Sequence, residues 1–167
     1  MGRLLDSCDT TVSASYRLFG LFDMTMGAET FDAAADMTNW LLPGPGLVYL
    51  QVPDQVGRTV IRLESWSTPP LLPPGEWAGR EEVEVELPEG ELGLQTVDGG
   101  LVQVPLVLPS PGTYRMRWQW VFNPDAGPFT SPLEGHSEVL AKQSGHEAAL
   151  RGEDQFCLVQ IWRTAAA

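Results

Sequence analysis

Thr113-Tyr114-Arg115-Met116-Arg117-Trp118-Gln119-Trp120-Val121-Phe122 is the stretch that decides the fold. Large apolar side chains stand at every second position from Tyr114 to Phe122, and polar side chains alternate with them as far as Gln119. Because successive side chains of a strand point to opposite faces, this alternation predicts a strand with one buried face and one solvent-facing face.

Similar strand signals recur at short intervals along the rest of the chain, separated by Pro, Gly and Asp residues. Such spacing is typical of a sandwich or a partly closed barrel and not of βαβ units. We therefore expect an all-β fold, an antiparallel β-sandwich of about eight strands with one short helix. The further strands are predicted at residues 12–22, 47–52, 59–65, 82–87, 92–96, 101–108 and 156–163.

Residues 101–108 and 113–122 are separated by Pro109-Ser110-Pro111-Gly112, so we expect them to form a hairpin with a rather long loop. Pro105 cannot donate a ladder hydrogen bond, which places its strand at a sheet edge or at a bulge. The helix is predicted at 30–42, where a Thr side chain can cap the first turn and a Pro-Gly-Pro-Gly run ends it.

A chain of 167 residues that is 43% hydrophobic is long enough for one core, so we expect a single domain over 1–167 with a long polar loop at 123–154. Residues 138–150 of that loop suit a short helix. Cys8, in an N-terminal segment expected to fray, and Cys157 lie far apart and are expected to be free thiols. The chain shows neither a secretory signal nor a run of about 20 apolar residues, so we expect a cytoplasmic protein that does not enter a membrane.

The formal net charge of −12, from 22 acids and 10 bases, argues against direct binding of nucleic acid, because that affinity depends on Lys and Arg. The segment 76–98 alone contains eight acids and one base and so supplies −7 of this charge. Strict alternation in 82–87 places three glutamates on one strand face, above Val83, Val85 and Leu87. The candidate partner-binding residues are Glu82, Glu84, Glu86, Glu89 and Glu91.

One row of strand carboxylates has about half the linear charge density of one DNA strand, so a second acidic row is needed to resemble a nucleic acid. With that second row the surface would attract a strongly basic protein such as a nuclease. The other interpretation is a solvated edge strand, whose like charges prevent edge-to-edge aggregation.

Two further hypotheses come from different classes of protein. Trp66 and Trp77 flank a proline-rich loop and suit an exposed contact with a carbohydrate or another small ligand. His136 and His146 lie in the long polar loop with Glu138 and Glu147, which would suit a metal-dependent enzyme if three ligands converged. The sequence contains no nucleophile elbow and no phosphate-binding glycine loop, so we expect no catalytic residues, no metal and no cofactor.

Three stretches, 12–19, 46–63 and 106–118, carry a family resemblance, and the last contains Leu108-Pro109, Gly112, Tyr114 and Trp118. They resemble the ComJ family of small bacterial competence proteins, which inhibit the DNA-entry nuclease. The resemblance implies a β-sandwich binding protein that covers the active face of a nuclease and performs no chemistry itself. The segment 123–154 is longer than the family pattern, and no inhibitory residue is transferred by position.

Overall fold

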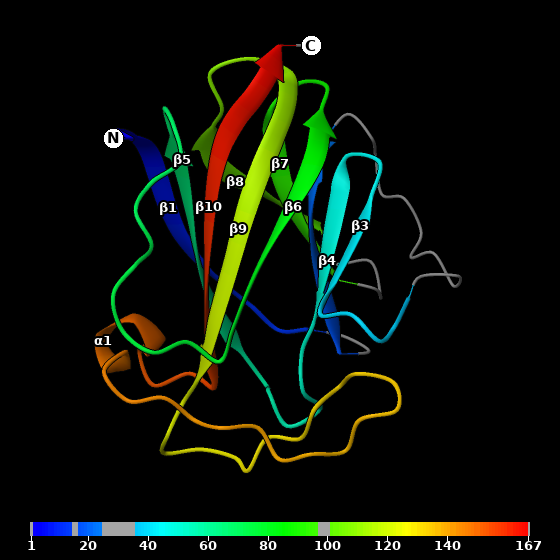
Figure 1. Ribbon diagram of the computed structural model, residues 1–167, viewed down its shortest axis with the longest axis vertical. Coiled ribbons are helices and arrows are strands. Elements are labelled where there is room, and N and C mark those ends of the chain that lie inside the picture. Colours follow the sequence, from blue (N-terminus) through cyan, green and yellow to red (C-terminus); the bar gives the residue numbers. More distant parts are fainter. Residues whose placement is uncertain (1, 15–16, 25–35, 97–100, 167) are drawn as a thin grey trace.

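The computed structural model describes residues 2–14, 17–24, 36–96 and 101–166. These residues form ten strands and one short helix, arranged as two five-stranded sheets (Figure 1). The elements are β1 Leu4–Val12, β2 Leu18–Asp23, β3 Leu41–Gly44, β4 Leu47–Gln51, β5 Thr59–Trp66, β6 Gly79–Leu87, β7 Glu91–Thr96, β8 Leu101–Val107, β9 Gly112–Phe122, α1 Glu147–Leu150 and β10 Gln155–Ala166. The predicted all-β fold is confirmed.

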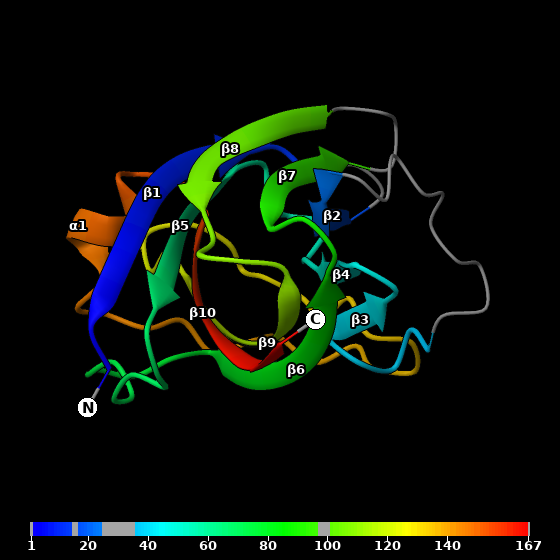
Figure 2. The same ribbon diagram turned by 90° about the horizontal axis from the view of Figure 1, so that it is seen from above.

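Sheet A has the strand order β1-β5-β10-β9-β6, and sheet B has the order β3-β4-β2-β7-β8. Neighbouring strands are antiparallel except β5 and β10, which run parallel. The edge strand β1 contacts β8, and the edge strand β6 contacts β3, so the sheets approach each other on both sides. Seen from above, the strands surround the core like a flattened barrel (Figure 2).

Strand β9 supplies the largest side chains of the core, as its sequence predicts. All of its alternate apolar residues from Tyr114 to Phe122 are at most 1% exposed, and they pack between the two sheets. Burial of each such aromatic side chain stabilises the fold by about 1.5–3 kcal/mol. The pattern in 113–122 therefore fixes which face of sheet A is internal.

The predicted hairpin of 101–108 with 113–122 is wrong. β8 pairs with β7 in sheet B, whereas β9 pairs with β10 and β6 in sheet A, so the proline-rich turn carries the chain from one sheet to the other. Local sequence signals cannot distinguish two strands of one sheet from two strands of facing sheets. The prediction for Pro105 is confirmed, because β8 is an edge strand and the ladder shifts register between Glu91 and Gly93.

The predicted strand at 12–22 is interrupted. Arg17 has a φ of 61°, which ends the extended conformation between the end of β1 at Val12 and the start of β2 at Leu18. The N-terminal segment does not fray, because β1 pairs with β5 from Leu4 to Val12, with one register shift between Leu4 and Asp6, and Cys8 packs against the core. Residues 4–12 show no strict alternation of apolar and polar side chains. The structure accounts for this, because most residues of β1 are half-buried on both faces of the sheet.

In the predicted helix at 30–42, residues 30–35 lie outside the described residues, and residues 36–42 are not helical. Its described end is wrong, because Leu41 and Leu42 begin β3 and pair with Leu50 and Tyr49. In the late segment, α1 falls inside the predicted 138–150, and Phe129 stacks on Phe122 with ring centroids 5.2 Å apart. The segment thus closes the lower end of the sandwich (Figure 1). Within the described residues, no helix is long and apolar enough to cross a membrane.

Gly79 and Gly44 offer a matched test of the packing of β6 against Trp120 of β9. A Cβ at Gly79 would overlap the indole of Trp120, whereas a Cβ at Gly44 would meet nothing within 4 Å. Gly79→Ala should therefore destabilise the fold by about 1–3 kcal/mol, and Gly44→Ala should change it by less than about 0.5 kcal/mol. Urea denaturation midpoints measure both, and equal midpoints for the two variants would contradict the packing described.

Candidate partner-binding surface

The outer face of sheet A is divided into an apolar part and a polar part. In the apolar part, α1 and the half-buried Trp77 cover a small satellite core. The buried members of this core are Val60, Val121, Leu150, Phe156 and Leu158. This part of the face is occupied by the protein itself and is closed to a partner.

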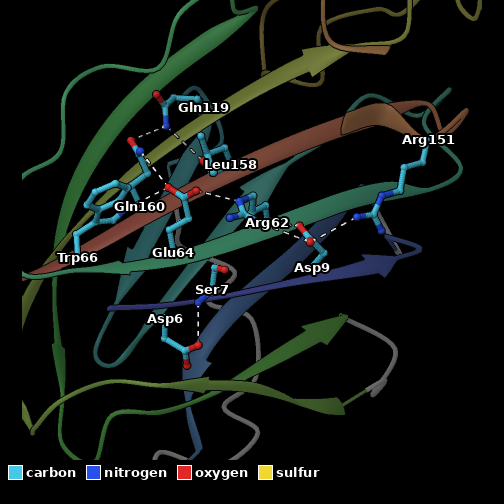
Figure 3. A network of polar contacts seen from close by, with 10 residues as sticks. All are labelled: Asp6, Ser7, Asp9, Arg62, Glu64, Trp66, Gln119, Arg151, Leu158 and Gln160. Carbon is cyan, nitrogen blue, oxygen red and sulfur yellow. Dashed lines mark hydrogen bonds and ion pairs between the residues drawn. The ribbon is translucent and has the colours of Figure 1, made fainter. Parts of the chain in front are cut away.

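A chain of charged and amide groups crosses the polar part of the face from β1 to β10 (Figure 3). Asp9 lies 3.4 Å from Nη1 of Arg62, and Nε of Arg62 lies 2.9 Å from Oε2 of Glu64. The other carboxylate oxygen of Glu64 accepts hydrogen bonds from Nε2 of Gln160 and Nε1 of Trp66. The hydrogen bond with Glu64 is the main cause of the raised pKa of Arg62. We call this chain the polar ladder.

Arg117 extends the polar ladder across β9 to β6. Its buried guanidinium donates from Nη1 to Oε1 of Gln160 at 3.0 Å and lies 3.2 Å from Oε2 of Glu82 through Nε. Arg115 lies 3.7 Å from Glu82 and 3.5 Å from Glu84. The protein's own arginines therefore partly neutralise two of the five predicted glutamates.

The remaining three predicted glutamates differ from these two. Glu86 lies near the end of β6, Glu89 lies in the turn that follows and Glu91 begins β7, and all three are exposed. Within the part of the chain that the structure describes, no ion pair involves Glu86, Glu89 or Glu91. We call these three residues the acidic corner.

A buried carboxylate fixes the loop that carries the acidic corner. Oδ2 of Asp23, which is 0% exposed, accepts hydrogen bonds from the backbone N–H groups of Glu89 at 2.9 Å and Gly90 at 3.0 Å. Gly90 has a φ of 78°, which glycine adopts without strain. The acidic corner is thus held on an ordered turn and not on a free loop.

Glu81 was not a predicted site residue, yet it links the edges of the two sheets. It points inward from β6, and burial raises the pKa of its carboxyl group, while the Leu41 N–H group, which donates a hydrogen bond to it, opposes the shift. An inward-pointing charge on an edge strand discourages pairing with another strand. The sequence analysis missed Glu81 because it considered only the glutamates on the outer face of the strand predicted at 82–87.

No family model and no curated protein matches the chain. ComJ from Bacillus subtilis, described as the inhibitor of the DNA degrading activity of NucA, superposes with a TM-score of 0.59 over 98% of this chain and 99% of its own, at 11% identity.

The chain shares its fold with ComJ. A second solved structure, crocagin biosynthetic gene J, gives a TM-score of 0.52 at 21% identity and covers 95% of this chain and 97% of its own. The resemblance to the ComJ family predicted from the sequence is confirmed at the level of the fold. It extends over nearly the whole chain, including the segment 123–154 that the sequence comparison left aside.

The two candidate tryptophans both have partners within the protein. Trp66 is half-buried and donates to Glu64 as part of the polar ladder. Trp77 packs against His146 with ring centroids 4.6 Å apart and against Phe156 at 6.2 Å. Both indoles thus contribute to the packing of the outer face.

The two histidines of the metal hypothesis, His136 and His146, contact different parts of the protein. Nδ1 of His136 lies 3.2 Å from Oε1 of Glu138, and Nε2 of His146 lies 2.7 Å from the carbonyl oxygen of Glu76. Among the described residues, no three His, Cys, Asp or Glu side chains are grouped so that they could hold a metal ion. The arrangement gives His146 a role in fastening the proline-rich loop to the late segment.

The polar ladder predicts that replacing Arg117 lowers the free energy of unfolding much more than replacing Arg115. Arg117→Ala removes a buried guanidinium, leaves the Pro70 carbonyl oxygen without that donor and leaves Oε1 of Gln160 with the 3.4 Å hydrogen bond from Gln119. It should lower the free energy of unfolding by about 3–5 kcal/mol. Arg115→Ala breaks only half-exposed pairs and should cost about 0–1 kcal/mol. Chemical denaturation measures the two costs, and similar values would contradict the role given to Arg117.

The pKa of Glu81 predicts a pH-dependent effect. Because this pKa is raised in the folded state, folding is favoured while the carboxyl group is protonated, and this stability is lost as the pH rises through the folded-state pKa. Glu81→Gln should therefore raise the urea midpoint at about pH 7 and leave it unchanged at about pH 3. Glu134→Gln, at an exposed position, measures the general effect of removing one negative charge; an equal rise at neutral pH would contradict the assignment.

Proposed function

We propose that the chain is a non-catalytic protein-binding module whose acidic corner binds a basic protein, and that this partner is a nuclease which it inhibits. The observation that carries the proposal is the set of three exposed carboxylates, Glu86, Glu89 and Glu91, for which the described residues supply no cation. Charges of this kind are available to a partner, and complementary charge speeds association and selects the partner.

The ion pairs of the polar ladder reduce the number of predicted glutamates that are freely available to a partner. Glu82 is half-exposed but lies within 3.2 Å of Arg117 and 3.7 Å of Arg115, and Glu84 lies 3.5 Å from Arg115. A basic partner would have to compete with these arginines for the two carboxylates. We therefore assign the main electrostatic attraction to the acidic corner and a rim role to Glu84.

The ordered turn supports the same proposal. Because Asp23 fixes the backbone at Glu89 and Gly90, the carboxylates beside them need little further ordering when a partner binds. Preorganisation of this kind reduces the entropy lost on association. A solvated edge strand that merely resists aggregation has no need of a buried carboxylate to hold its end.

The fold and the charge together support a nuclease as the partner. ComJ, which has this fold, inhibits the DNA degrading activity of NucA. A nuclease attracts the phosphates of DNA with basic side chains, and an acidic protein can compete for the same surface. The net charge of −12 adds a long-range attraction to any such partner.

Association with purified nucleases, a panel that includes NucA, tests the proposal. The triple variant Glu86→Gln, Glu89→Gln, Glu91→Gln should associate about 10-fold more slowly at low salt, with a flatter salt dependence, because three steering charges are lost. Protection of DNA from degradation should weaken in parallel. Stopped-flow or surface-plasmon kinetics and a DNA degradation assay measure both effects.

A matched control separates the acidic corner from the overall charge. Asp54→Asn, Asp125→Asn and Glu134→Gln together remove the same charge from exposed positions elsewhere, and they should slow association by less than about 3-fold. Equal slowing by the two triple variants would contradict a localised site. Failure of the wild-type protein to bind or inhibit any nuclease of the panel would exclude the nuclease as partner.

A further inference from the structure

Arg17 is a cation without a partner in a protein that has 22 acids. Its side chain is exposed, and within the described residues no ion pair or hydrogen bond involves its guanidinium group. Its φ of 61° is a left-handed conformation, which is strained for a residue with a Cβ. The Val52 N–H group donates to the Arg17 carbonyl oxygen at 2.9 Å and holds this conformation in place. Backbone strain of this kind is concentrated at functional sites.

The side chain of Arg17 lines a hollow of about 290 Å³ at the lower end of the sandwich, where the segment 123–154 passes beneath β2 and β4 (Figure 1). The other walls come from Met37, from Gln51 at the end of β4 and from residues 131–136. This volume is close to the lower limit of ligand pockets, so the hollow suits a small molecule.

Hydrogen bonds fix the walls of the hollow relative to one another. Nε2 of Gln51, which is 2% exposed, donates to the carbonyl oxygens of Met37 at 2.9 Å and Asn39 at 2.8 Å. The Glu134 N–H group donates to the same Met37 carbonyl oxygen at 2.9 Å. The hollow is therefore built before a ligand binds, which reduces the entropy lost on association.

Charges of both signs line the hollow without touching. Glu134 lines it together with Arg17, yet the two side chains form no ion pair. Oγ of the buried Ser131 accepts a hydrogen bond from the Leu133 N–H group at 3.3 Å, so the hydroxyl proton of Ser131 is free to donate. Arg17 and Ser131 can thus bind a carboxylate, and Glu134 can bind an ammonium group.

His136 adds a second acceptor to the same hollow. Its Nδ1 atom lies 3.2 Å from Oε1 of Glu138, and because a carboxylate accepts hydrogen bonds, Nδ1 carries the proton. Nε2 of the neutral ring is then an acceptor, and it has no hydrogen-bond partner among the described residues. An ammonium group in the hollow can donate to it.

The rest of the lining is apolar and is formed by Met37, Pro132 and Leu133. Pro132 is buried, and Met37 and Leu133 are half-buried, so their apolar surface is only partly covered by the protein. An apolar group of a ligand gains free energy when it packs against such a surface. The hollow therefore offers a carboxylate site, an ammonium site and an apolar wall.

A second hollow, of about 320 Å³, also borders Arg17. Its lining includes Asp54 and the apolar residues Val52, Pro53 and Val56. Among the described residues that line it, Arg17 is the one side chain that can donate a hydrogen bond. The first hollow has the larger set of polar groups, and we assign the ligand to it.

We propose that the hollow between Arg17 and Glu134 binds a free α-amino acid with an apolar side chain. Arg17 and Ser131 bind its carboxylate, Glu134 and His136 bind its ammonium group, and its side chain packs on Met37 and Leu133. A ligand without net charge is not repelled by the net charge of −12. The proposal does not depend on the proposed function, because the acidic corner lies at the upper end of the sandwich (Figure 1).

Isothermal titration calorimetry of the whole chain with leucine and methionine tests the proposal. Isocaproate is leucine without its amine, and isoamylamine is leucine without its carboxylate. Each should bind at least about 10-fold more weakly than leucine, because each leaves one charged group of the hollow without its partner. Failure of the wild-type protein to bind leucine or methionine at about 10 mM would overturn the proposal, and so would equal binding of leucine and its two analogues.

Two pairs of variants locate the site. Arg17→Met should weaken leucine binding at least about 10-fold, whereas Arg3→Met, which removes another exposed arginine, should leave it unchanged. Glu134→Gln should also weaken binding, whereas Asp54→Asn, in the second hollow, should not. Wild-type affinity in Arg17→Met would overturn the proposal, as would weakening by Asp54→Asn with none by Glu134→Gln.

Arg17→Gly separates binding from stability. Glycine adopts a φ of 61° without strain, so this variant should have a higher melting temperature than the wild-type protein and should lose leucine binding. A lower melting temperature would assign Arg17 a structural role and would contradict the proposal.

Discussion

The buried guanidinium of Arg117 is the interaction on which the outer face of sheet A depends. It binds Glu82 on β6, Gln160 on β10 and the carbonyl oxygen of Pro70, and it stacks over the ring of Trp162 at 5.1 Å. A buried cation is tolerated only when it is paired and hydrogen-bonded in this way. One side chain therefore holds the edge strand and the proline-rich loop in place, and it offsets part of the negative charge of the surface between them.

This arrangement distinguishes two groups of carboxylates. Four carboxylates form ion pairs with Arg62, Arg115 or Arg117, which neutralise them at least in part; they are those of Asp9, Glu64, Glu82 and Glu84. The carboxylates of the acidic corner form no such ion pairs among the described residues and face the solvent.

The sequence predicts the inner half of this structure better than the outer half. Alternation in 113–122 and 82–87 predicts correctly which side chains of β9 and β6 face the core, because this depends on the strand's own period. The solvent exposure predicted for the other face of β9 is wrong at Arg117 and Gln119, which are 6% and 0% exposed, because contacts with other strands and with the proline-rich loop bury them. Pairing of Arg117 with Glu82 depends on the register of two strands 35 residues apart, which alternation does not specify. The same limit explains the missed β1, the wrong hairpin and the overestimate of Glu82 and Glu84 as free charges.

Amide hydrogen exchange, measured on the protein alone and saturated with a nuclease that it binds, tests the central claim most directly. If the acidic corner is the contact, amides of residues 84–92 gain protection in the complex, while those of the proline-rich loop and of the segment 123–154 exchange as before. Protection confined to that loop or that segment, with residues 84–92 unchanged, would contradict the account.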